Sequence, residues 1–267
     1  AGPVEMALRV MDWRGLFLVL AGLCVVVALA LLVLVRDAPI GTKKGDHGGL
    51  LRGLGSILSS RWLWRIAPLV MTSQGTFMAV AGLWIGPWLR DVAGLEREEA
   101  TSIVTACSAG MGIGFLFMGT LAERLARRGM STLVVAGAGM LGFMGVQAVL
   151  VFGLPLAPLP VWVLFGLLGS SGVLGYAVLT QGFPATFAGR ANTAINMFIF
   201  LTAFAVQYGF GLIVRQWPSG VEVYGAEGYR TALGLALAAQ ALAFGWYCVP
   251  ARPDSRVAPG GRACDEG

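Results

Sequence analysis

The chain has 267 residues, of which 57% are hydrophobic and only 12% are charged, and its mean hydropathy is +0.75. A soluble domain carries about 25% charged residues, so this composition excludes an ordinary water-soluble protein and indicates that much of the surface faces lipid. The net charge of +5 does not indicate nucleic-acid binding, because the basic residues lie in short loops between apolar runs.

Seven uncharged apolar runs follow one another along the chain: Leu16–Val35, 66–86, 100–122, 133–152, 161–182, 192–214 and 231–249. A helix needs about 20 apolar residues to cross the hydrocarbon core of a bilayer. The dipeptides Gly86-Pro87 and Phe183-Pro184 are typical of helix ends and are predicted to close the second and fifth runs. The sequence therefore predicts an all-α membrane protein with seven transmembrane helices.

The basic residues are divided unequally between the two sides on which the loops must lie. When successive loops are assigned alternately to two sides, one side receives thirteen Lys and Arg residues and the other receives six. Because cytoplasmic loops carry the excess of Lys and Arg, the side with thirteen is predicted to be cytoplasmic. This places the C-terminus in the cytoplasm and residue 1 outside, with the chain in the plasma membrane or bacterial inner membrane.

Residues with metal-binding or catalytic chemistry are few and scattered. Cys24, Cys107, Cys248 and Cys264 form no C-x-x-C pair and are interpreted as small buried hydrophobic residues. The single histidine, His47, lies in a polar connection. We therefore expect no metal site, no cofactor and no catalytic residue.

The connection between the third and fourth runs carries the most specific pattern. It reads Gly119-Thr-Leu-Ala-Glu123-Arg124-Leu-Ala-Arg127-Arg128-Gly129. Glycine lets a neighbouring helix approach closely, and a carboxylate at a helix end can pair with arginine or face the N-terminus of an adjacent helix. The pattern resembles the cytoplasmic loop signature of the major facilitator superfamily, Gly-x-x-x-Asp-Arg-x-x-Arg-Arg, with Glu123 in place of Asp and Ala126 in place of a frequent Gly.

This resemblance implies a transporter built of two six-helix halves, in which the signature joins the second and third helices of a half. It also implies that the loop holds cytoplasmic helix ends together and releases them during transport. Residues 1–15 are then predicted as a stub of a preceding helix with an external loop, 16–35 as helix six, 36–62 as the central cytoplasmic loop, 63–250 as the C-terminal six-helix half and 251–267 as a cytoplasmic tail. The implied partners are a small-molecule substrate, the lipid bilayer and an N-terminal half that is missing from this chain.

In this family the substrate site lies near mid-membrane between the halves, so polar and aromatic residues inside the runs are the candidates. The second run repeats such residues at helical spacing (Gln74, Phe77, Ala81, Trp84, Trp88), as does the sixth (Asn196, Phe200, Ala203, Gln207). We predict substrate contacts from Gln74, Phe77, Trp84, Asn196, Phe200 and Gln207, with Thr76, Tyr176, Thr180 and Gln181 as secondary candidates. Amides combined with aromatic rings suit a neutral or hydroxylated solute, although the same amides would also serve to bridge helices.

The predicted function is a secondary active transporter, or permease, that moves a small solute by alternating access. None of the seven runs contains an acidic residue or histidine, so either coupling resides in the missing helices or transport is not proton-driven. Two alternatives stay open: an intramembrane enzyme, because Gly169-Ser170-Ser171-Gly172 matches a Gly-x-Ser-Gly nucleophile element, and a channel-like protein. Glycine-rich stretches such as 108–114, 137–145 and 166–175 are interpreted as close helix crossings.

Overall fold

The computed structural model describes residues 7–8, 10–34, 54–220 and 223–249. Within these ranges, seven helices are long and apolar enough to cross a membrane. This confirms the predicted all-α membrane fold. Most of the predicted central loop over 36–62 lies outside the described residues, as do the predicted tail over 251–267, His47 and Cys264.

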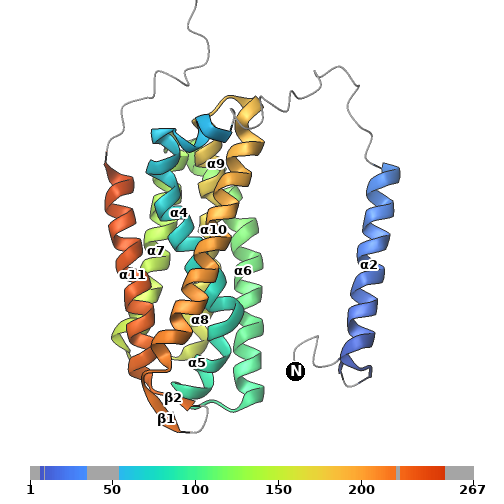
Figure 1. Ribbon diagram of the computed structural model, residues 1–267, viewed down its shortest axis with the longest axis vertical. Helices are drawn as coiled ribbons and strands as arrows, with labels where there is room; N and C mark the ends of the chain where they lie inside the picture. The colour runs from blue at the N-terminus through green and yellow to red at the C-terminus, as the bar shows by residue number, and fades with distance from the viewer. Residues whose placement is uncertain (1–6, 9, 35–53, 221–222, 250–267) are drawn as a thin grey trace, which may run out of the picture. The chain divides into compact units, whose positions relative to one another are not determined.

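The chain divides into two compact units, Ala1–Leu50 and Leu51–Gly267. The first contains α2 (Trp13–Leu34), a 22-residue helix with no buried side chain (Figure 1). Its start is fixed by Asp12, whose Oδ1 atom accepts a hydrogen bond of 2.8 Å from the backbone N–H of Gly15. A helix that is apolar on every side is suited to a lipid environment.

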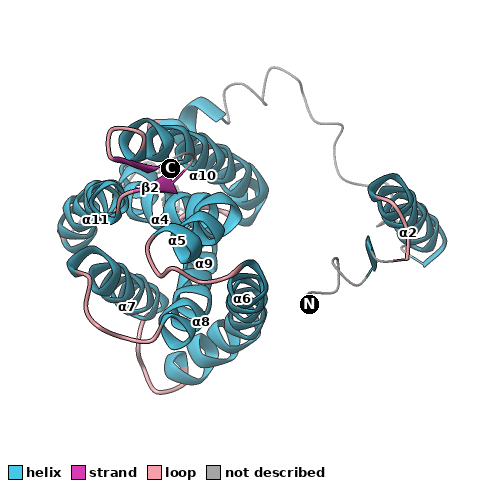
Figure 2. Ribbon diagram, turned by 90° about the horizontal axis from the view of Figure 1, so that it is seen from below, coloured by secondary structure: helices cyan, strands magenta, loops and turns pink. Residues whose placement is uncertain are grey.

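The second unit is a bundle of six spans, shown from the side in Figure 1 and along its axis in Figure 2. Two spans are interrupted helices, and a short hairpin precedes the last span. In chain order the elements are α4 (Arg61–Ala79), η1 (Val80–Trp84), α5 (Ile85–Asp91), α6 (Arg97–Ala126), α7 (Thr132–Phe152), α8 (Pro158–Gly169), η2 (Ser170–Gly172), α9 (Val173–Gln181), α10 (Ala185–Val214), β1 (Pro218–Gly220), β2 (Val223–Tyr224) and α11 (Ala226–Cys248). The end of the bundle at β1 and β2 is called the hairpin end, and the end at the turn between α6 and α7 is called the motif end.

Local sequence signals set several helix ends. Ser60 and Ser131 cap α4 and α7, since their hydroxyl oxygens accept from the backbone N–H groups of Trp62 and Val134. At the other end of α7, Gly153 adopts a φ of 60°, a left-handed conformation that favours glycine. Pro184 lies at the N-cap of α10, in agreement with the helix end expected at Phe183-Pro184.

The helix end expected at Gly86-Pro87 is wrong. Both residues lie inside α5, and the second span continues from Arg61 to Asp91. The five residues Val80–Trp84 just before them form a π-helical turn, in which the N–H of Ile85 bonds to the carbonyl of Val80. Proline lacks an N–H and crowds the preceding turn of an α-helix, and this wider turn lets the chain continue through Pro87 as a helix.

The spans differ in how central they are. Within an apolar stretch of 18 residues in each span, 61% of residues are buried in the α4–α5 span and in the α8–α9 span. The corresponding share is 22% in α10 and 28% in both α6 and α11. The buried apolar residues form two clusters, one toward the motif end, from Ile57 to Tyr247, and one toward the hairpin end, from Phe77 to Leu233. Between them in the two central spans lie buried polar residues, namely Ser73, Gln74, Thr76, Ser170 and Ser171.

Glycine allows α6 and α8 to approach closely. A Cβ atom on Gly110, Gly114 or Gly166 would collide with backbone atoms of the facing helix. Gly112, by contrast, faces open space on α6. Backbone contact of this kind is typical of small residues at membrane helix crossings.

A pair of buried amides joins α7 to α11. Gln147 and Gln240 exchange two hydrogen bonds, each 2.9 Å long between an Nε2 and an Oε1 atom, and neither side chain is exposed. Each amide thereby satisfies the other in an apolar setting.

The expected burial of the cysteines holds for one of the three described. Cys107 is buried, whereas Cys24 and Cys248 are exposed. A thiol behaves as a small apolar group, so a helix surface that faces lipid accepts cysteine as readily as a packed core does.

Candidate functional site

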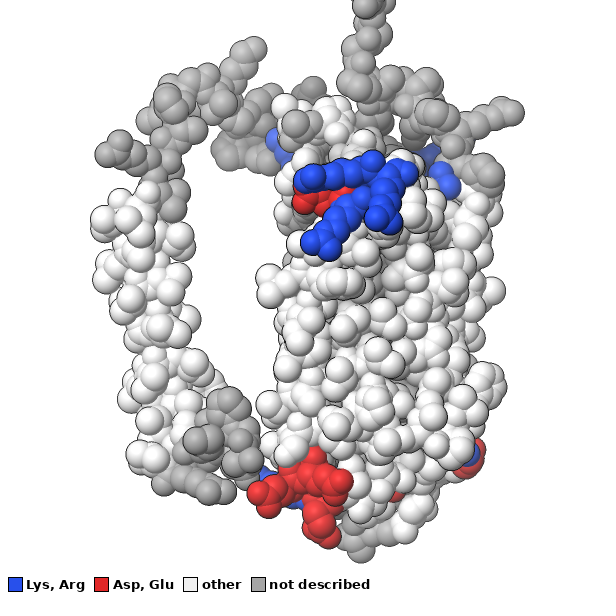
Figure 3. All heavy atoms as spheres, turned by 180° about the vertical axis from the view of Figure 1, so that it is seen from behind, with Lys and Arg blue, Asp and Glu red and all other residues white. Residues whose placement is uncertain are grey.

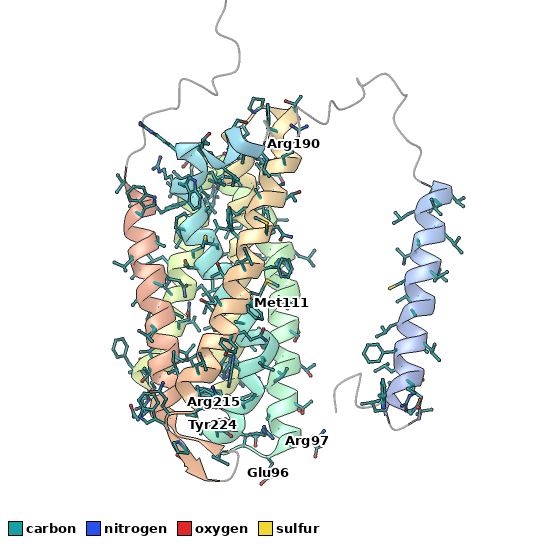
Figure 4. The ribbon with its side chains drawn as sticks, in the orientation of Figure 1. Glu96, Arg97, Met111, Arg190, Arg215 and Tyr224 are labelled. Atoms are coloured by element: carbon teal, nitrogen blue, oxygen red, sulfur yellow. The ribbon has the colours of Figure 1, made fainter. Side chains whose placement is uncertain are left out.

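Three cavities lie beside the second span, and two of them toward the hairpin end. The aromatic cavity, of about 450 Å³, lies between this span and α10 and is lined by Leu83, Trp84, Phe204, Gln207, Tyr208, Gly211, Leu212, Arg215 and Tyr224. The arginine cavity, of about 340 Å³, lies between α5 and α6 and is lined by Gly86, Pro87, Arg90, Arg97, Ala100, Thr101 and Val104. The middle cavity, of about 240 Å³, is lined by Phe77, Met78, Ala81, Gly82, Ile85, Val104, Cys107, Ser108 and Met111. Figure 4 marks Met111 on α6 and places Arg97, Arg215 and Tyr224 at the hairpin end.

Two of the predicted substrate contacts, Trp84 and Gln207, meet in the aromatic cavity. The indole Nε1 of Trp84 donates to the backbone carbonyl of Gln207 at 3.3 Å. The Trp84 ring stacks on Phe210 with centroids 4.8 Å apart. The ring also meets Tyr229 edge-on at 6.4 Å. Trp84 is therefore held by α10 and α11 while one part of it lines the cavity.

Gln74 and Phe77 lie elsewhere, inside the bundle. Phe77 packs against Phe143 of α7 and Phe165 of α8, with centroid distances of 6.0 and 5.9 Å, and it also lines the middle cavity. The side chain of Gln74 packs against Gly172 of η2, where a Cβ atom would collide with it. Its Oε1 atom is buried without a hydrogen-bond partner. The structure thus separates these two residues from Trp84.

The single stripe expected along the second span is not present. Phe77 faces α7 and α8, Trp88 contacts Trp162 of α8 at 5.3 Å, and Trp84 faces α10 and α11. The physical reason is η1. A π-helical turn holds more residues than an α-helical turn, so the spacing of 3.6 residues that the sequence argument assumed does not hold across Val80–Trp84.

Asn196 and Phe200 lie on the exposed surface of α10. The hydroxyl of Tyr176 on α9 donates to Oδ1 of Asn196 at 2.7 Å, and Phe200 is exposed. Neither residue lines the three cavities. The structure therefore brings together Trp84 with Gln207, and Asn196 with Tyr176, but it does not bring all six predicted residues together.

The remaining secondary candidates have local structural partners or are buried. Thr76 is buried in α4. Thr180 donates to the backbone carbonyl of Ala177. Gln181 donates from Nε2 to the hydroxyl of Thr132 at 3.2 Å, which joins α9 to the start of α7.

Several residues of the aromatic cavity were missed by sequence reasoning. Phe204, Tyr208, Gly211 and Arg215 recur at helical spacing on α10. This stripe is adjacent to the predicted stripe that contains Ala203 and Gln207. Its aromatic rings and terminal arginine are the sequence features that could have indicated the cavity. Asn192 was also missed; its Oδ1 atom is buried without a partner one turn before Asn196.

A carboxylate fixes the hairpin end around these cavities. Oδ2 of Asp91, the last residue of α5, accepts a hydrogen bond of 2.7 Å from the hydroxyl of Tyr229 on α11. The same atom accepts one of 3.4 Å from the backbone N–H of Tyr224 in β2. In the described part of the chain, no group of three or more His, Cys, Asp or Glu side chains is placed to hold a metal ion.

The charged loop motif forms one local ion pair. Glu123 and Arg127 lie one helical turn apart, with Oε1 and Nη2 at 2.6 Å, and both side chains are exposed. With the neighbouring Arg124 and Arg128, which are also exposed, they form the charged patch at the upper end of the bundle in Figure 3. A Cβ atom on Gly119 would meet open space. An exposed pair of this kind contributes about 0–1 kcal/mol, so the motif adds little to the stability of the bundle.

The Gly169–Gly172 element that suggested a nucleophile forms a helix crossing. The hydroxyl of Ser170 donates to the carbonyl of Leu167 at 2.6 Å. Ser171 is fully buried, and its side chain occupies the space that a Cβ atom on Gly139 of α7 would need. Both serines thus lie in packed helix contacts.

A family model described as Major Facilitator Superfamily matches residues 5–207. A search of curated proteins found no match.

Proposed function

We propose, on the premise that the chain belongs to the major facilitator superfamily, that it forms part of a secondary active transporter that moves a small solute by alternating access. Members of this family are transporters rather than enzymes, and the seven apolar helices make the chain an integral membrane protein. The observation that carries the proposal is the row of cavities along the α4–α5 span. This span lies within the region that the family model matches.

The proposed layout follows the order of the spans. In it, α2 corresponds to helix six, the spans from α4 to α11 form the C-terminal half, and an N-terminal half completes the transport pathway. The motif after the second span of this half supports that alignment. Two of the least buried spans of the bundle, α6 and α10, lie on either side of the α4–α5 span, and in this layout they carry the surface on which the other half would pack.

The proposed orientation rests on charge. The motif end carries Glu123 with three arginines of the loop motif (Figure 3), and thirteen of the nineteen Lys and Arg residues fall on that side. By the bias of basic residues toward the cytoplasm, the motif end and the C-terminus face the cytoplasm of a plasma or bacterial inner membrane, and the hairpin end faces outward.

The proposed binding residues divide into three groups. Trp84 and Gln207 in the aromatic cavity are the first group, and Asn196, Phe200 and Tyr176 on the α10 surface are the second. Gln74 and Phe77 contribute from inside the bundle, since Gln74 retains a buried acceptor atom without a partner that a bound solute or water would satisfy.

Counterflow in proteoliposomes tests the proposal. The chain is reconstituted alone and together with the first five helices of a family member, since α2 would itself supply helix six, and exchange of labelled sugars, amino acids and organic acids against internal unlabelled solute is measured. We expect saturable counterflow only when both halves are present. Single-channel currents would indicate a pore, and absence of counterflow in both samples would oppose a carrier.

A double substitution tests the residues. Gln74→Leu with Asn196→Leu should abolish or strongly reduce counterflow while protein level and thermal stability remain near those of the unsubstituted chain. Normal counterflow by the well-folded double variant would show that these amides do not bind substrate and serve only to bridge helices.

A further inference from the structure

We propose that the aromatic cavity binds a small organic anion with a flat apolar body, whose carboxylate lies against Arg215. The inference rests on the proposed function in that this anion would be a transported solute. Binding itself can be measured without transport.

The apolar part of the cavity comes from two elements. Leu83 and Trp84 of η1 form one wall, and Phe204 and Tyr208 of α10 form the other. The rings of Phe204 and Tyr208 are nearly parallel, at 6° with centroids 6.4 Å apart, and they are 69% and 63% exposed. Exposed parallel rings offer flat faces against which another ring or alkyl chain can pack.

Gly211 keeps the cavity open between these walls. A Cβ atom on this residue would come within 3.3 Å of the Trp84 ring. The absence of a side chain at Gly211 therefore leaves room for a ligand along the edge of the indole. A volume of about 450 Å³ accommodates a small ligand of the kind that pockets of about 300–1,000 Å³ bind.

The polar part of the cavity is cationic. Arg215, Gln207 and Tyr224 line it, and Arg215 and Tyr224 lie close together at the hairpin end in Figure 4. No ion pair involves Arg215 within the described ranges of the chain. A guanidinium group offers two parallel N–H donors to a carboxylate, whereas an ammonium ligand would be repelled.

Other charges at the hairpin end also bear on whether the cavity binds an anion or a cation. Arg215 follows the last residue of α10, where a helix C-terminus carries about −0.5 charge, which reduces but does not reverse the positive charge of the guanidinium. Arg90 and Arg97 line the neighbouring arginine cavity at the same end, but Glu96, Glu98 and Glu99 at the start of α6 offset their charge, so the preference for an anion rests on Arg215. Asp91 hydrogen-bonds Tyr224 and Tyr229 but does not line the aromatic cavity.

This ligand class differs from the neutral or hydroxylated solute expected from sequence. That expectation combined Gln74 and Asn196 with aromatic rings, and neither amide lines the aromatic cavity. The residues that do line it combine four aromatic side chains with Arg215, for which the described residues provide no ion-pair partner.

The test compares two probes of nearly equal shape. The full chain is placed in nanodiscs of zwitterionic lipid, and binding of radiolabelled phenylacetate and its neutral amide, phenylacetamide, is measured by scintillation proximity, with empty discs subtracted. We expect saturable binding of phenylacetate and at least about tenfold weaker binding of phenylacetamide, since a hydrogen bond to a charged group contributes about 1.5–3 kcal/mol.

Variants assign the preference to Arg215. Arg215→Gln should bring the two affinities within about twofold, and Arg215→Lys should retain part of the preference. Gly211→Leu should fill the cavity and remove binding of both probes. The matched control is Arg230→Gln, because Arg230 lies at the same end but is already paired with Glu227 at 2.9 Å; it should keep the full preference.

The outcomes separate this inference from the transport proposal. Equal affinities for the two probes, no saturable binding of either, or a preference that persists in a folded Arg215→Gln variant would overturn the inference. Counterflow of other solutes would then leave the transport proposal standing. Phenylacetate binding without any counterflow by the combined halves would support the cavity and oppose transport.

Discussion

At the scale of single residues, Gln147 and Gln240 satisfy each other between α7 and α11 with two hydrogen bonds. Such a pair behaves differently when one or both partners are removed. One remaining amide leaves buried donors and an acceptor unpaired, whereas two apolar side chains leave none.

We therefore expect Gln147→Leu to destabilise the chain by about 1–3 kcal/mol, and the double variant with Gln240→Leu to be more stable than either single variant. Unfolding by sodium dodecyl sulfate from mixed micelles measures these differences. Gln216→Leu serves as control because Gln216 is exposed, and its substitution should change stability little. A double variant less stable than both single variants would contradict the account.

Two glycines of α6 give a second prediction at this scale. Gly114→Ala should cost about 1–3 kcal/mol, because the added methyl group collides with the α8–η2 segment. Gly112→Ala, two residues earlier and facing open space, should be neutral or stabilise the helix by up to about 1 kcal/mol. Thermal unfolding in detergent compares the two, and equal effects would show that the α6–α8 crossing does not depend on Gly114.

The candidate site was only partly predictable from single residues. Trp84 and Gln207 were found because a tryptophan and an amide inside an apolar run are conspicuous. Phe204 and Tyr208 were missed because an aromatic residue in a membrane helix is equally suited to facing lipid. Arg215 was counted only as a loop charge, although its position one turn after Gly211 places it in the same cavity.

At the scale of elements, Asp91 joins α5, β2 and α11. It is the last residue of α5, and its carboxylate accepts hydrogen bonds from the hydroxyl of Tyr229 in α11 and from the backbone N–H of Tyr224 in β2. The hairpin end is thus held by polar contacts in addition to apolar packing.

A double-mutant cycle measures this junction. Tyr229→Phe should cost about 1.5–3 kcal/mol, and its effect should be strongly non-additive with that of Asp91→Ala, with a coupling of about 0.5–3 kcal/mol. Tyr247→Phe is the control, because its hydroxyl donates to Leu133 at the motif end and its effect should add to that of Asp91→Ala. Additive behaviour of Tyr229 and Asp91 would refute the junction.

The elements themselves show where sequence patterns reach their limit. All seven predicted runs lie inside the observed spans or within about three residues of them, because apolar length is a direct requirement of the bilayer. The second run was ended too early at Gly86-Pro87, because the π-helical turn just before these residues lets the helix continue through the proline. The π-helical turn at Val80–Trp84 ends at Trp84, which packs against α10 and α11, and a single sequence carries no clear signal for it.

At the scale of the whole molecule, the composition alone determined the fold class, and the loop motif indicated the family that the comparison then showed. The arrangement of the spans around the α4–α5 and α8–α9 spans came from the structure, because neither hydropathy nor charge distinguishes a central membrane helix from a peripheral one.

Orientation gives the prediction that belongs to this scale. In a variant with all four native cysteines replaced by serine, Gln216→Cys at the hairpin end should react with a membrane-impermeant maleimide on intact cells. Arg128→Cys at the motif end should react only after the membrane is opened. The reverse pattern would invert the orientation inferred from the thirteen basic residues on the motif side.

The polar residues between the two apolar clusters have a mechanical consequence. Ser73, Gln74, Ser170 and Ser171 form a buried polar layer between the two apolar clusters; one central span departs from the α-helix within this layer, at η2, and the other does so further along, at η1. We therefore expect bending of the central spans to concentrate at this level. Helices at one end of the bundle could then move apart while the side-chain packing at the other end is kept.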